Sequence, residues 1–179
     1  MNVADYRAAL ARAELVHDEA SIRSAMQRMA AEIDAELHDE SALFITVMNG
    51  GMIFAGQLAT MLKAPVQLDY LHASRYRGAT SGGELNWLAH PRAEMRDRTV
   101  LLVDDILDEG YTLRAIREHC LEQGARRVLI AVLCEKKHGR VVPDLVADFV
   151  GLEVPDRYVF GYGMDYHELG RSLPAIVAL

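Results

Sequence analysis

Hydrophobic positions in the first 37 residues recur at the spacing of amphipathic helices. Tyr6, Leu10 and Ala13 predict a short helix over residues 3–15. Asp18 is a typical N-cap residue, and a longer helix is predicted after it. The apolar face of that second helix carries Ile22, Met26, Met29, Ile33 and Leu37. We interpret these side chains as part of the core.

Later segments have the patterns of strands. Apolar runs typical of strands buried on both faces occupy residues 43–48, 100–103 and 128–133, and residues 66–71 alternate as in a half-buried strand. A helix is predicted from near Tyr111 to Gln123, with Gly124 just beyond its end. Residues 73–83 form a polar, glycine-rich stretch, and residues 85–88 are predicted to return from it as a strand. This alternation predicts an α/β fold with a central, mainly parallel sheet and helices on both faces.

Composition limits the class of protein. The 179 residues predict a single domain over 1–179, with a core over about 38–145 and a small hood built from the N-terminal region and residues 146–179. The formal net charge of −7 argues against a nucleic-acid-binding surface. The sequence predicts no membrane span and no secretory signal. Two cysteines without a disulfide framework predict reduced thiols and a cytoplasmic protein.

The stretch from Val100 to Leu113 concentrates the candidate chemistry. A buried strand is followed by Asp104 and Asp105, then by a loop with a glycine and by a helix. Ligands bind at this carboxyl edge in open α/β sheets, and amides at the helix start can hold a phosphate. The two acids could bind ribose hydroxyls and Mg²⁺. An Asp-Asp pair alone would also fit a solvated turn.

Two other segments are candidates for the same edge. Asn49, Gly50 and Gly51 follow the strand over 43–48 and precede a helical pattern, so they could bind a second phosphate or simply form a turn. Lys136 follows the strand over 128–133, where a lysine is either a solvated residue or a donor to a ligand.

Two stretches of the sequence resemble those of a known family. The stretch Val100–Thr112 resembles the phosphoribosyl-diphosphate (PRPP) signature of the type I phosphoribosyltransferases: a hydrophobic strand, two acids, two apolar residues, then Asp, Gly and Thr at alternate positions. Residues 147–168 resemble the C-terminal hood of the hypoxanthine-guanine phosphoribosyltransferases. The resemblance implies purine salvage, in which the enzyme transfers the phosphoribosyl group of PRPP to hypoxanthine or guanine with Mg²⁺ and releases IMP or GMP and pyrophosphate.

The resemblance also implies a role for each matching residue. Asp108 would be the catalytic general base. The PRPP ribose and 5′-phosphate would be held by Asp104, Asp105, Asp108, Glu109, Gly110, Tyr111 and Thr112. Pyrophosphate would bind Asn49, Gly50 and Arg171. A mobile loop that includes Ser74, Arg75 and Tyr76 would close over the reacting sugar. The purine would contact Lys136, Tyr158, Val159 and Asp165. Asp104, Asp105 and Asp165 would hold Mg²⁺. By themselves, Tyr158 would be interpreted as a core aromatic and Arg171 as a surface charge.

Two functional alternatives remain at the level of sequence. Lys136 fits any 6-oxopurine, so a xanthine-preferring enzyme is one of them. A nucleotide-sensing regulator that binds RNA is the other, and the net charge of −7 argues against it. The family resemblance further implies a homodimer or homotetramer, with no membrane partner.

The chain departs from the family pattern at Asn49, where many relatives have Lys, and at Glu109, where Thr or Ser is usual. A carboxylate facing a phosphate would weaken binding, so the Glu109 side chain is expected to point away from the loop and leave its amide to bind. Glu109→Thr should then change the PRPP Michaelis constant by less than about tenfold, or under ~1.4 kcal/mol. Steady-state kinetics at saturating purine measures this. A much larger fall in the constant would show that Glu109 faces the phosphate.

Overall fold

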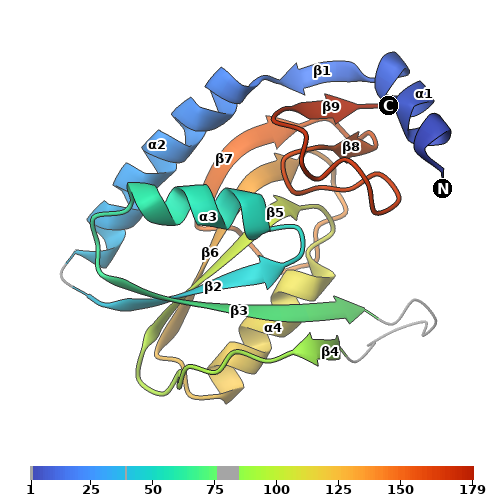
Figure 1. Cartoon of the computed structure of the whole chain (residues 1–179). Coiled ribbons are helices and arrows are strands. Elements are labelled where there is room, and N and C mark those ends of the chain that lie inside the picture. The colour runs from blue at the N-terminus through green and yellow to red at the C-terminus, as the bar shows by residue number, and fades with distance from the viewer. Residues whose placement is uncertain (1, 39, 76–84) are drawn as a thin grey trace.

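A six-stranded sheet organises the chain. The computed structural model describes residues 2–38, 40–75 and 85–179. The sheet has the strand order β4-β3-β2-β5-β6-β7, and a second sheet has the order β1-β9-β8 (Figure 1). The helices are α1 (Val3–Arg12), α2 (Glu19–Leu37), α3 (Met52–Met61) and α4 (Tyr111–Glu122). The strands are β1 (Glu14–His17), β2 (Ala42–Met48), β3 (Val66–Arg75), β4 (Leu85–Ala89), β5 (Thr99–Leu107), β6 (Arg127–Lys136), β7 (Phe149–Val154), β8 (Val159–Phe160) and β9 (Ile176–Ala178).

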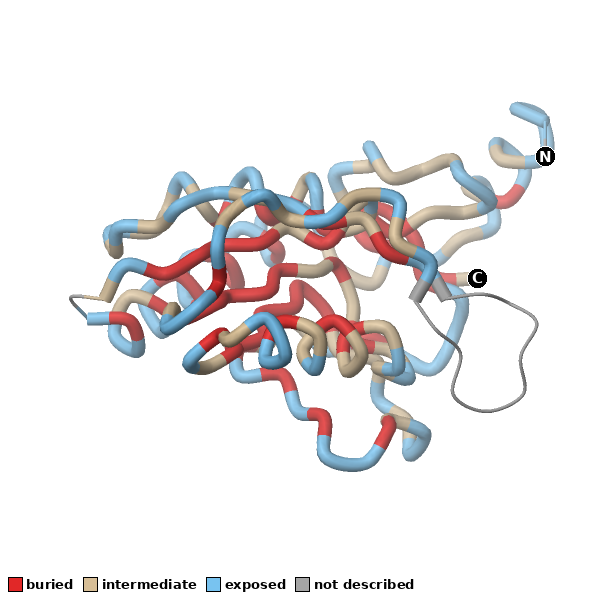
Figure 2. The backbone as a smooth tube through the Cα atoms, turned by 90° about the horizontal axis from the view of Figure 1, so that it is seen from below, coloured by how far each residue is buried: buried red, intermediate tan, exposed pale blue. Residues whose placement is uncertain are grey.

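Helices cover both faces of the larger sheet, which confirms the predicted α/β fold. Neighbouring strands run parallel, except that β3 and β4 form an antiparallel pair. Helices α2 and α3 lie on one face and α4 on the other (Figure 1). The central strands accordingly carry long runs of buried positions (Figure 2). Two covered faces explain why these strands have continuous apolar sequences.

Strand β5 lies at the centre of the sheet. Leu101 pairs with Phe44 of β2 and with Leu129 of β6, and all three belong to the core under α2 and α3. Val100 and Leu102 belong to the other core, under α4. Successive side chains along a strand point to opposite faces, so the same alternation continues into the acids that follow. Two packed layers therefore fix where the acidic end of β5 lies.

The predicted helices after Asp18 and near Tyr111 are present. The Asp18 side chain caps α2 by accepting from the Ser21 amide at 2.8 Å. Helix α4 ends at Glu122, one residue before the predicted end, and Gly124 follows with a φ of 87°. A glycine adopts this left-handed conformation without steric cost.

Three predicted boundaries were wrong. The first helix ends at Arg12 because residues 14–17 pair with β9 as strand β1. Strand β3 continues through Ser74 to Arg75, paired with β4, so residues 73–75 are strand and not the predicted loop; Tyr76 and residues 77–84 lie outside the described residues. Strand β5 extends through Asp104 and Asp105 to Leu107, since β6 continues to pair with it. In each case, strand pairing across the fold overrode the local pattern.

The predicted hood is divided between the two sheets. Strand β7 belongs to the larger sheet, and α2 packs against it, with Arg28 donating to the carbonyl oxygens of Val150 at 3.2 Å and Gly151 at 2.6 Å. The smaller antiparallel sheet joins β1 to β8 and β9, so the two ends of the chain meet above the larger sheet (Figure 1). Within the described part of the chain, no helix is long and apolar enough to cross a membrane.

Packing of α2 should contribute strongly to stability. Ile33 is fully buried against the larger sheet, so Ile33→Ala should lower the free energy of unfolding by about 2–5 kcal/mol. Urea denaturation measures the change. Gln27→Ala, on the exposed side of the same helix, is the matched control and should stay within about 0.5 kcal/mol. A loss below about 1 kcal/mol for Ile33→Ala would contradict this packing.

Candidate active site

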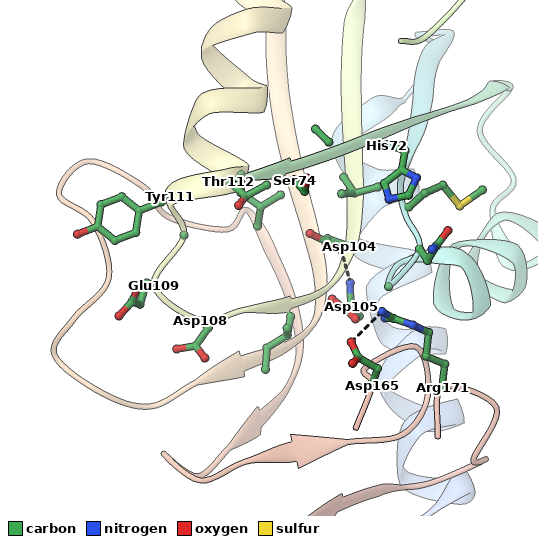
Figure 3. Close-up of a pocket in the computed structure, with 18 of the residues that line it drawn as sticks. His72, Ser74, Asp104, Asp105, Asp108, Glu109, Tyr111, Thr112, Asp165 and Arg171 are labelled. Carbon is green, nitrogen blue, oxygen red and sulfur yellow. Dashed lines mark hydrogen bonds and ion pairs between the residues drawn. The ribbon is translucent and has the colours of Figure 1, made fainter. Parts of the chain in front are cut away.

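A cleft of about 740 Å³ opens at the carboxyl edge of the larger sheet. Side chains from the ends of β2, β3 and β5 line it, together with the start of α4 and the segment before β9 (Figure 3). The predicted residues that line it are Asn49, Gly50, Ser74, Asp104, Asp105, Asp108, Glu109, Gly110, Tyr111, Thr112, Asp165 and Arg171. The cleft therefore brings together the predicted ribose, phosphate and pyrophosphate residues.

The loop between β5 and α4 is built to present backbone amides. Gly110 has a φ of 82°, and a Cβ there would lie 2.5 Å from Leu145 Cδ2, so the position requires glycine. No side chain in the described part of the chain caps the α4 N-terminus by a hydrogen bond. Thr112 lines the cleft beside this helix end (Figure 3). A helix start of this kind can bind a phosphate.

Glu109 lies on the outside of this loop. Its carboxylate points away from Thr112 (Figure 3), and its carbonyl oxygen accepts a hydrogen bond from the Val142 amide at 2.9 Å. The side chain is exposed to solvent. This orientation is the one expected from the sequence, and it leaves the interior of the loop free of a carboxylate.

Asp104 and Asp105 are neighbouring carboxylates in a buried setting, with Arg171 partly offsetting their charge. Because they are successive residues of β5, their side chains leave the strand on opposite sides, and Asp104 Oδ1 accepts from the Asp105 amide at 2.9 Å. Burial and the neighbouring Asp105 carboxylate raise the pKa of Asp104 well above its usual value. Burial also raises the pKa of Asp105. The pair would gain from a cation or from hydroxyl donors.

The turn after β2 packs closely on these acids. The peptide between Met48 and Asn49 is cis, and the Gly51 amide donates to the Val47 carbonyl oxygen at 2.9 Å. A Cβ on Gly50 would collide with the Asp105 carboxylate, so only glycine fits. The turn thereby lies directly beside Asp105 in the cleft.

Arg171 reaches the cleft from the segment before β9. Its guanidinium donates to the Gly163 carbonyl oxygen at 2.7 Å and forms an ion pair with Asp165 at 2.7 Å (Figure 3). Glu168 lies 3.6 Å from the same group. The local sequence pattern gave no reason to separate this arginine from a surface residue, whereas the family resemblance placed it in the site, and it lines the cleft with the two acids.

A second, smaller cleft adjoins the first. It has a volume of about 280 Å³ and is lined by Asp105, Ile106, Asp108, Lys136, Tyr158, Val159, Met164 and Asp165. All four predicted purine residues are in this set. Tyr158 is 49% exposed, so it is not a core aromatic, and its hydroxyl donates to the Asp165 carbonyl oxygen at 3.2 Å. The two clefts share Asp105, Ile106, Asp108 and Asp165, so one ligand could extend across both.

Asp108 stands at the junction of the clefts with both carboxylate oxygens bonded. Lys136 Nζ lies 2.5 Å from Oδ2, and His138 Nε2 lies 2.6 Å from Oδ1. Burial acts to raise the pKa of Asp108, but the hydrogen bonds from Lys136 and His138 outweigh it, so the pKa is below its usual value. The carboxylate is therefore held ionised.

Sequence reasoning missed several residues of the site: His72, Ile106, Arg140, Met164 and Glu168, which line the clefts, and His138, which contacts Asp108 from outside them. His72 could have been found, because it lies two positions before Ser74 on the same face of β3. Ile106 follows the acids within β5. The other four lie on loops whose course no local pattern specified. Arg75 ends β3, and Tyr76 lies outside the described residues.

The predicted metal residues do not form a ready-made cage. In the described ranges, no group of three or more His, Cys, Asp or Glu could hold a metal ion. Asp165 is paired with Arg171 instead of approaching the other two acids as a ligand. Mg²⁺, however, is usually held by one or two carboxylates together with substrate oxygens and water. Asp104 and Asp105 fit that limited role, because burial disfavours their ionised forms and Arg171 offsets this only in part.

Comparison with known proteins identifies the class. Residues 13–168 match the phosphoribosyl transferase domain family. The hypoxanthine-guanine phosphoribosyltransferase of Bacillus subtilis is 35% identical over 162 residues, which cover 90% of this chain and 89% of that protein. The Aquifex aeolicus enzyme of the same name is 33% identical over 165 residues, covering 91% and 92%. The chain therefore belongs to the phosphoribosyltransferase family.

Solved structures narrow the relationship. A Bacillus anthracis hypoxanthine-guanine phosphoribosyltransferase superposes with a TM-score of 0.88 at 28% identity, covering 93% of this chain and 98% of that one. A Staphylococcus aureus hypoxanthine phosphoribosyltransferase gives a TM-score of 0.87 at 28% identity, covering 93% and 90%. Within the family, this chain thus groups with the hypoxanthine-guanine enzymes, and the resemblance first seen in two motifs extends over nearly its whole length.

The buried acids should lower the stability of the ligand-free protein. A pKa raised by folding means that stability falls as the pH rises from the unfolded-state pKa through the folded one. Asp104→Asn should therefore raise the free energy of unfolding at pH 7 by about 1 kcal/mol, and the gain should shrink toward pH ~3, below the pKa of both states, where both bind the proton. Denaturation at the two pH values measures this effect.

Asp144→Asn is the matched control for that measurement. Asp144 is exposed, and Asn tolerates its φ of 64°, so this variant should leave stability within about 0.5 kcal/mol. A lower stability of Asp104→Asn at pH 7 would contradict the account of the acid pair.

Proposed function

We propose that this protein transfers the phosphoribosyl group of PRPP to hypoxanthine or guanine, giving IMP or GMP and pyrophosphate. One observation carries the proposal: two adjoining clefts share Asp105, Ile106, Asp108 and Asp165. The larger cleft offers anion donors at a helix start, and the smaller one offers Lys136 beside an exposed aromatic ring. The residues that line the larger cleft suit a sugar phosphate, and those that line the smaller cleft suit a 6-oxopurine.

The phosphoribosyl group would occupy the larger cleft. The 5′-phosphate would accept hydrogen bonds from the amides of Glu109 to Thr112 and from the Thr112 hydroxyl, at the N-terminus of α4. Asp104 and Asp105 would accept from the ribose hydroxyls, which relieves part of their charge. Ser74 lines the same cleft from the end of β3, so it would lie near the bound sugar.

Mg²⁺ would be held by Asp104 and Asp105 together with substrate oxygens, with Asp165 as the third candidate. When bound, it would supply Lewis-acid stabilisation of the departing pyrophosphate. Burial raises the pKa of both aspartates, and the Asp105 carboxylate raises that of Asp104 further, so a divalent cation would stabilise their ionised forms.

Pyrophosphate would lie between the turn after β2 and Arg171. Asn49 and Gly50 line the cleft there, so backbone amides and the Asn49 amide would donate to it. Arg171 would add a positive charge, and it would then share its donors between the anion and Asp165. Because Asn49 is neutral, Arg171 would supply the positive charge that compensates the pyrophosphate at this end of the cleft.

The base would enter the smaller cleft. Lys136 has only donors, which favours a 6-oxo group over a 6-amino group. Tyr158 is exposed and would stack on the purine ring, while the Val159 backbone would bond the base edge. Asp165 would accept from the 2-amino group of guanine.

Asp108 would act as the general base. As N9 of the purine forms its bond to C1 of the ribose, the bond from C1 to pyrophosphate breaks and the N7 proton passes to Asp108. The pKa of this aspartate is below its usual value, so it is ionised at neutral pH and ready to accept that proton. Each of its oxygens keeps a second lone pair beside the bonds to Lys136 and His138.

We also infer that the protein forms a homodimer or homotetramer. The exposed apolar side chains Leu68, Tyr70 and Leu88, on β3 and β4, would suit such an interface. A solved structure of the Trypanosoma cruzi hypoxanthine phosphoribosyl transferase concerns the role of that protein's C-terminal region in its oligomeric state.

A coupled assay with PRPP and Mg²⁺ tests the function. Hypoxanthine or guanine should be turned over, adenine should not, and chelation of Mg²⁺ should abolish turnover. Asp108→Asn keeps the shape of the residue but cannot take the proton, so its kcat should fall by about 10²–10⁴-fold. Asp144→Asn, exposed and outside both clefts, should keep full activity.

Two results would overturn the assignment. Turnover of xanthine in preference to the other bases would make this a xanthine phosphoribosyltransferase. Binding of RNA with no turnover of any base would favour a regulator, although the net charge of −7 opposes that outcome.

A further inference from the structure

His138 lies next to the reacting end of the site without being part of either cleft's lining. It follows β6, two residues after Lys136, and its side chain is only 2% exposed. Its Nε2 atom is 2.6 Å from Asp108 Oδ1. A buried imidazole at this distance from a carboxylate is a strong hydrogen-bonding partner, and nothing in the sequence pattern had pointed to it.

The loop fixes which ring nitrogen carries the proton. The Arg140 backbone N–H donates to His138 Nδ1 at 3.0 Å. An amide N–H can only donate, so Nδ1 must be the acceptor and the imidazole proton must be on Nε2. The ring is then neutral, and its Nε2–H group points at Asp108.

The two oxygens of Asp108 are therefore held by different partners. Lys136 Nζ donates to Oδ2 at 2.5 Å, and His138 Nε2 donates to Oδ1 at 2.6 Å. If Lys136 turns toward a purine oxygen, its bond to Asp108 Oδ2 weakens. The bond from the His138 imidazole to Oδ1 then holds the carboxylate in place. A carboxylate bonded at one oxygen alone can rotate about its Cβ–Cγ bond.

We propose that neutral His138 is a positioning residue, which orients the Asp108 carboxylate for proton transfer through its Nε2–H group. This inference rests on the proposed role of Asp108 as the base. His138 itself would not touch the substrate; it would act through the aspartate.

The surrounding charges define how the site responds to pH. Arg140 makes two bonds to Asp156, at 2.8 and 2.7 Å, so much of its charge is compensated. Glu109 is exposed, and Lys136 is the cation in direct contact with Asp108. Loss of the imidazole donor would raise the pKa of Asp108, since the bonds from Lys136 and His138 both lower it. The acidic limb of the rate profile would then move to higher pH.

Two substitutions separate the bond to Asp108 from the bond to the loop. In His138→Gln, the side-chain amide nitrogen can reach the place of Nε2 and still donate to Asp108. In His138→Asn, the side chain can accept from the Arg140 amide in place of Nδ1 but is too short to reach Asp108. Lys137→Gln, at an exposed neighbouring residue, controls for changes in the loop.

The experiment measures kcat, KM and the pH dependence of kcat/KM for hypoxanthine at saturating PRPP. His138→Asn should lower kcat by about tenfold or more at pH 7, with little change in KM for PRPP, and should move the acidic limb up by about one pH unit. The kcat of His138→Gln should stay within about threefold of that of the unmodified protein, and the kcat of Lys137→Gln should equal that of the unmodified protein. Equal kinetics in the Asn and Gln variants would overturn the proposal, even if both were less stable.

Nitrogen-15 NMR of His138 tests the geometry without turnover. The proposal requires protonated Nε2 and unprotonated Nδ1 at neutral pH, and a change in the Nε2 signal in Asp108→Asn. The opposite tautomer would overturn it whatever the activity. If Asp108→Asn stayed fully active, Asp108 would not be the base, and the proposed role of His138 would fail with it. The NMR result would then show separately whether the hydrogen bond from His138 Nε2 to Asp108 exists.

Discussion

Burial of strand β5 on both faces is the constraint on which the rest of the structure depends. Packing between α2 and α3 on one side and α4 on the other fixes the strand, and the same alternation carries Asp104 and Asp105 into the cleft. Burying two adjacent carboxylates is unfavourable, as their raised pKa values show. The protein thus stores electrostatic strain where a cation and a hydroxyl-rich ligand would bind, a common conflict between stability and function.

The site also needs both ends of the chain. The ends of parallel strands supply the loop between β5 and α4, the turn after β2 and Lys136, whereas Tyr158, Asp165 and Arg171 come from the C-terminal segment. That segment is tied to the N-terminus through the β1–β9 pair and through an ion pair between Arg157 and Glu14 at 2.7 Å. Asp108, where the two clefts meet, is held on both oxygens. The charged groups are therefore ordered before a ligand arrives, which is how preorganised sites stabilise developing charge.

The sequence predicted much of this, for definable reasons. Long periodic segments such as the one from Ile22 to Leu37 specify their own helix, and the strand–glycine–helix pattern around Gly110 specifies its own turn. The extension of β5 past Asp105 and the strand at Glu14 depended on pairing with distant residues, so no local pattern could predict them. His138 illustrates the same limit: its contact with Asp108 joins two loops 30 residues apart. The match of Tyr158 and Arg171 to the family, not their local pattern, indicated their place in the site.

A crystal structure with Mg²⁺ and bound IMP would test most directly whether the two clefts hold one nucleotide. The account predicts the 5′-phosphate at the start of α4, the ribose hydroxyls at Asp104 and Asp105, and the base between Tyr158 and Ile106, with its 6-oxygen facing Lys136. A base bound outside the smaller cleft, or a phosphate away from Gly110 and Thr112, would contradict the account.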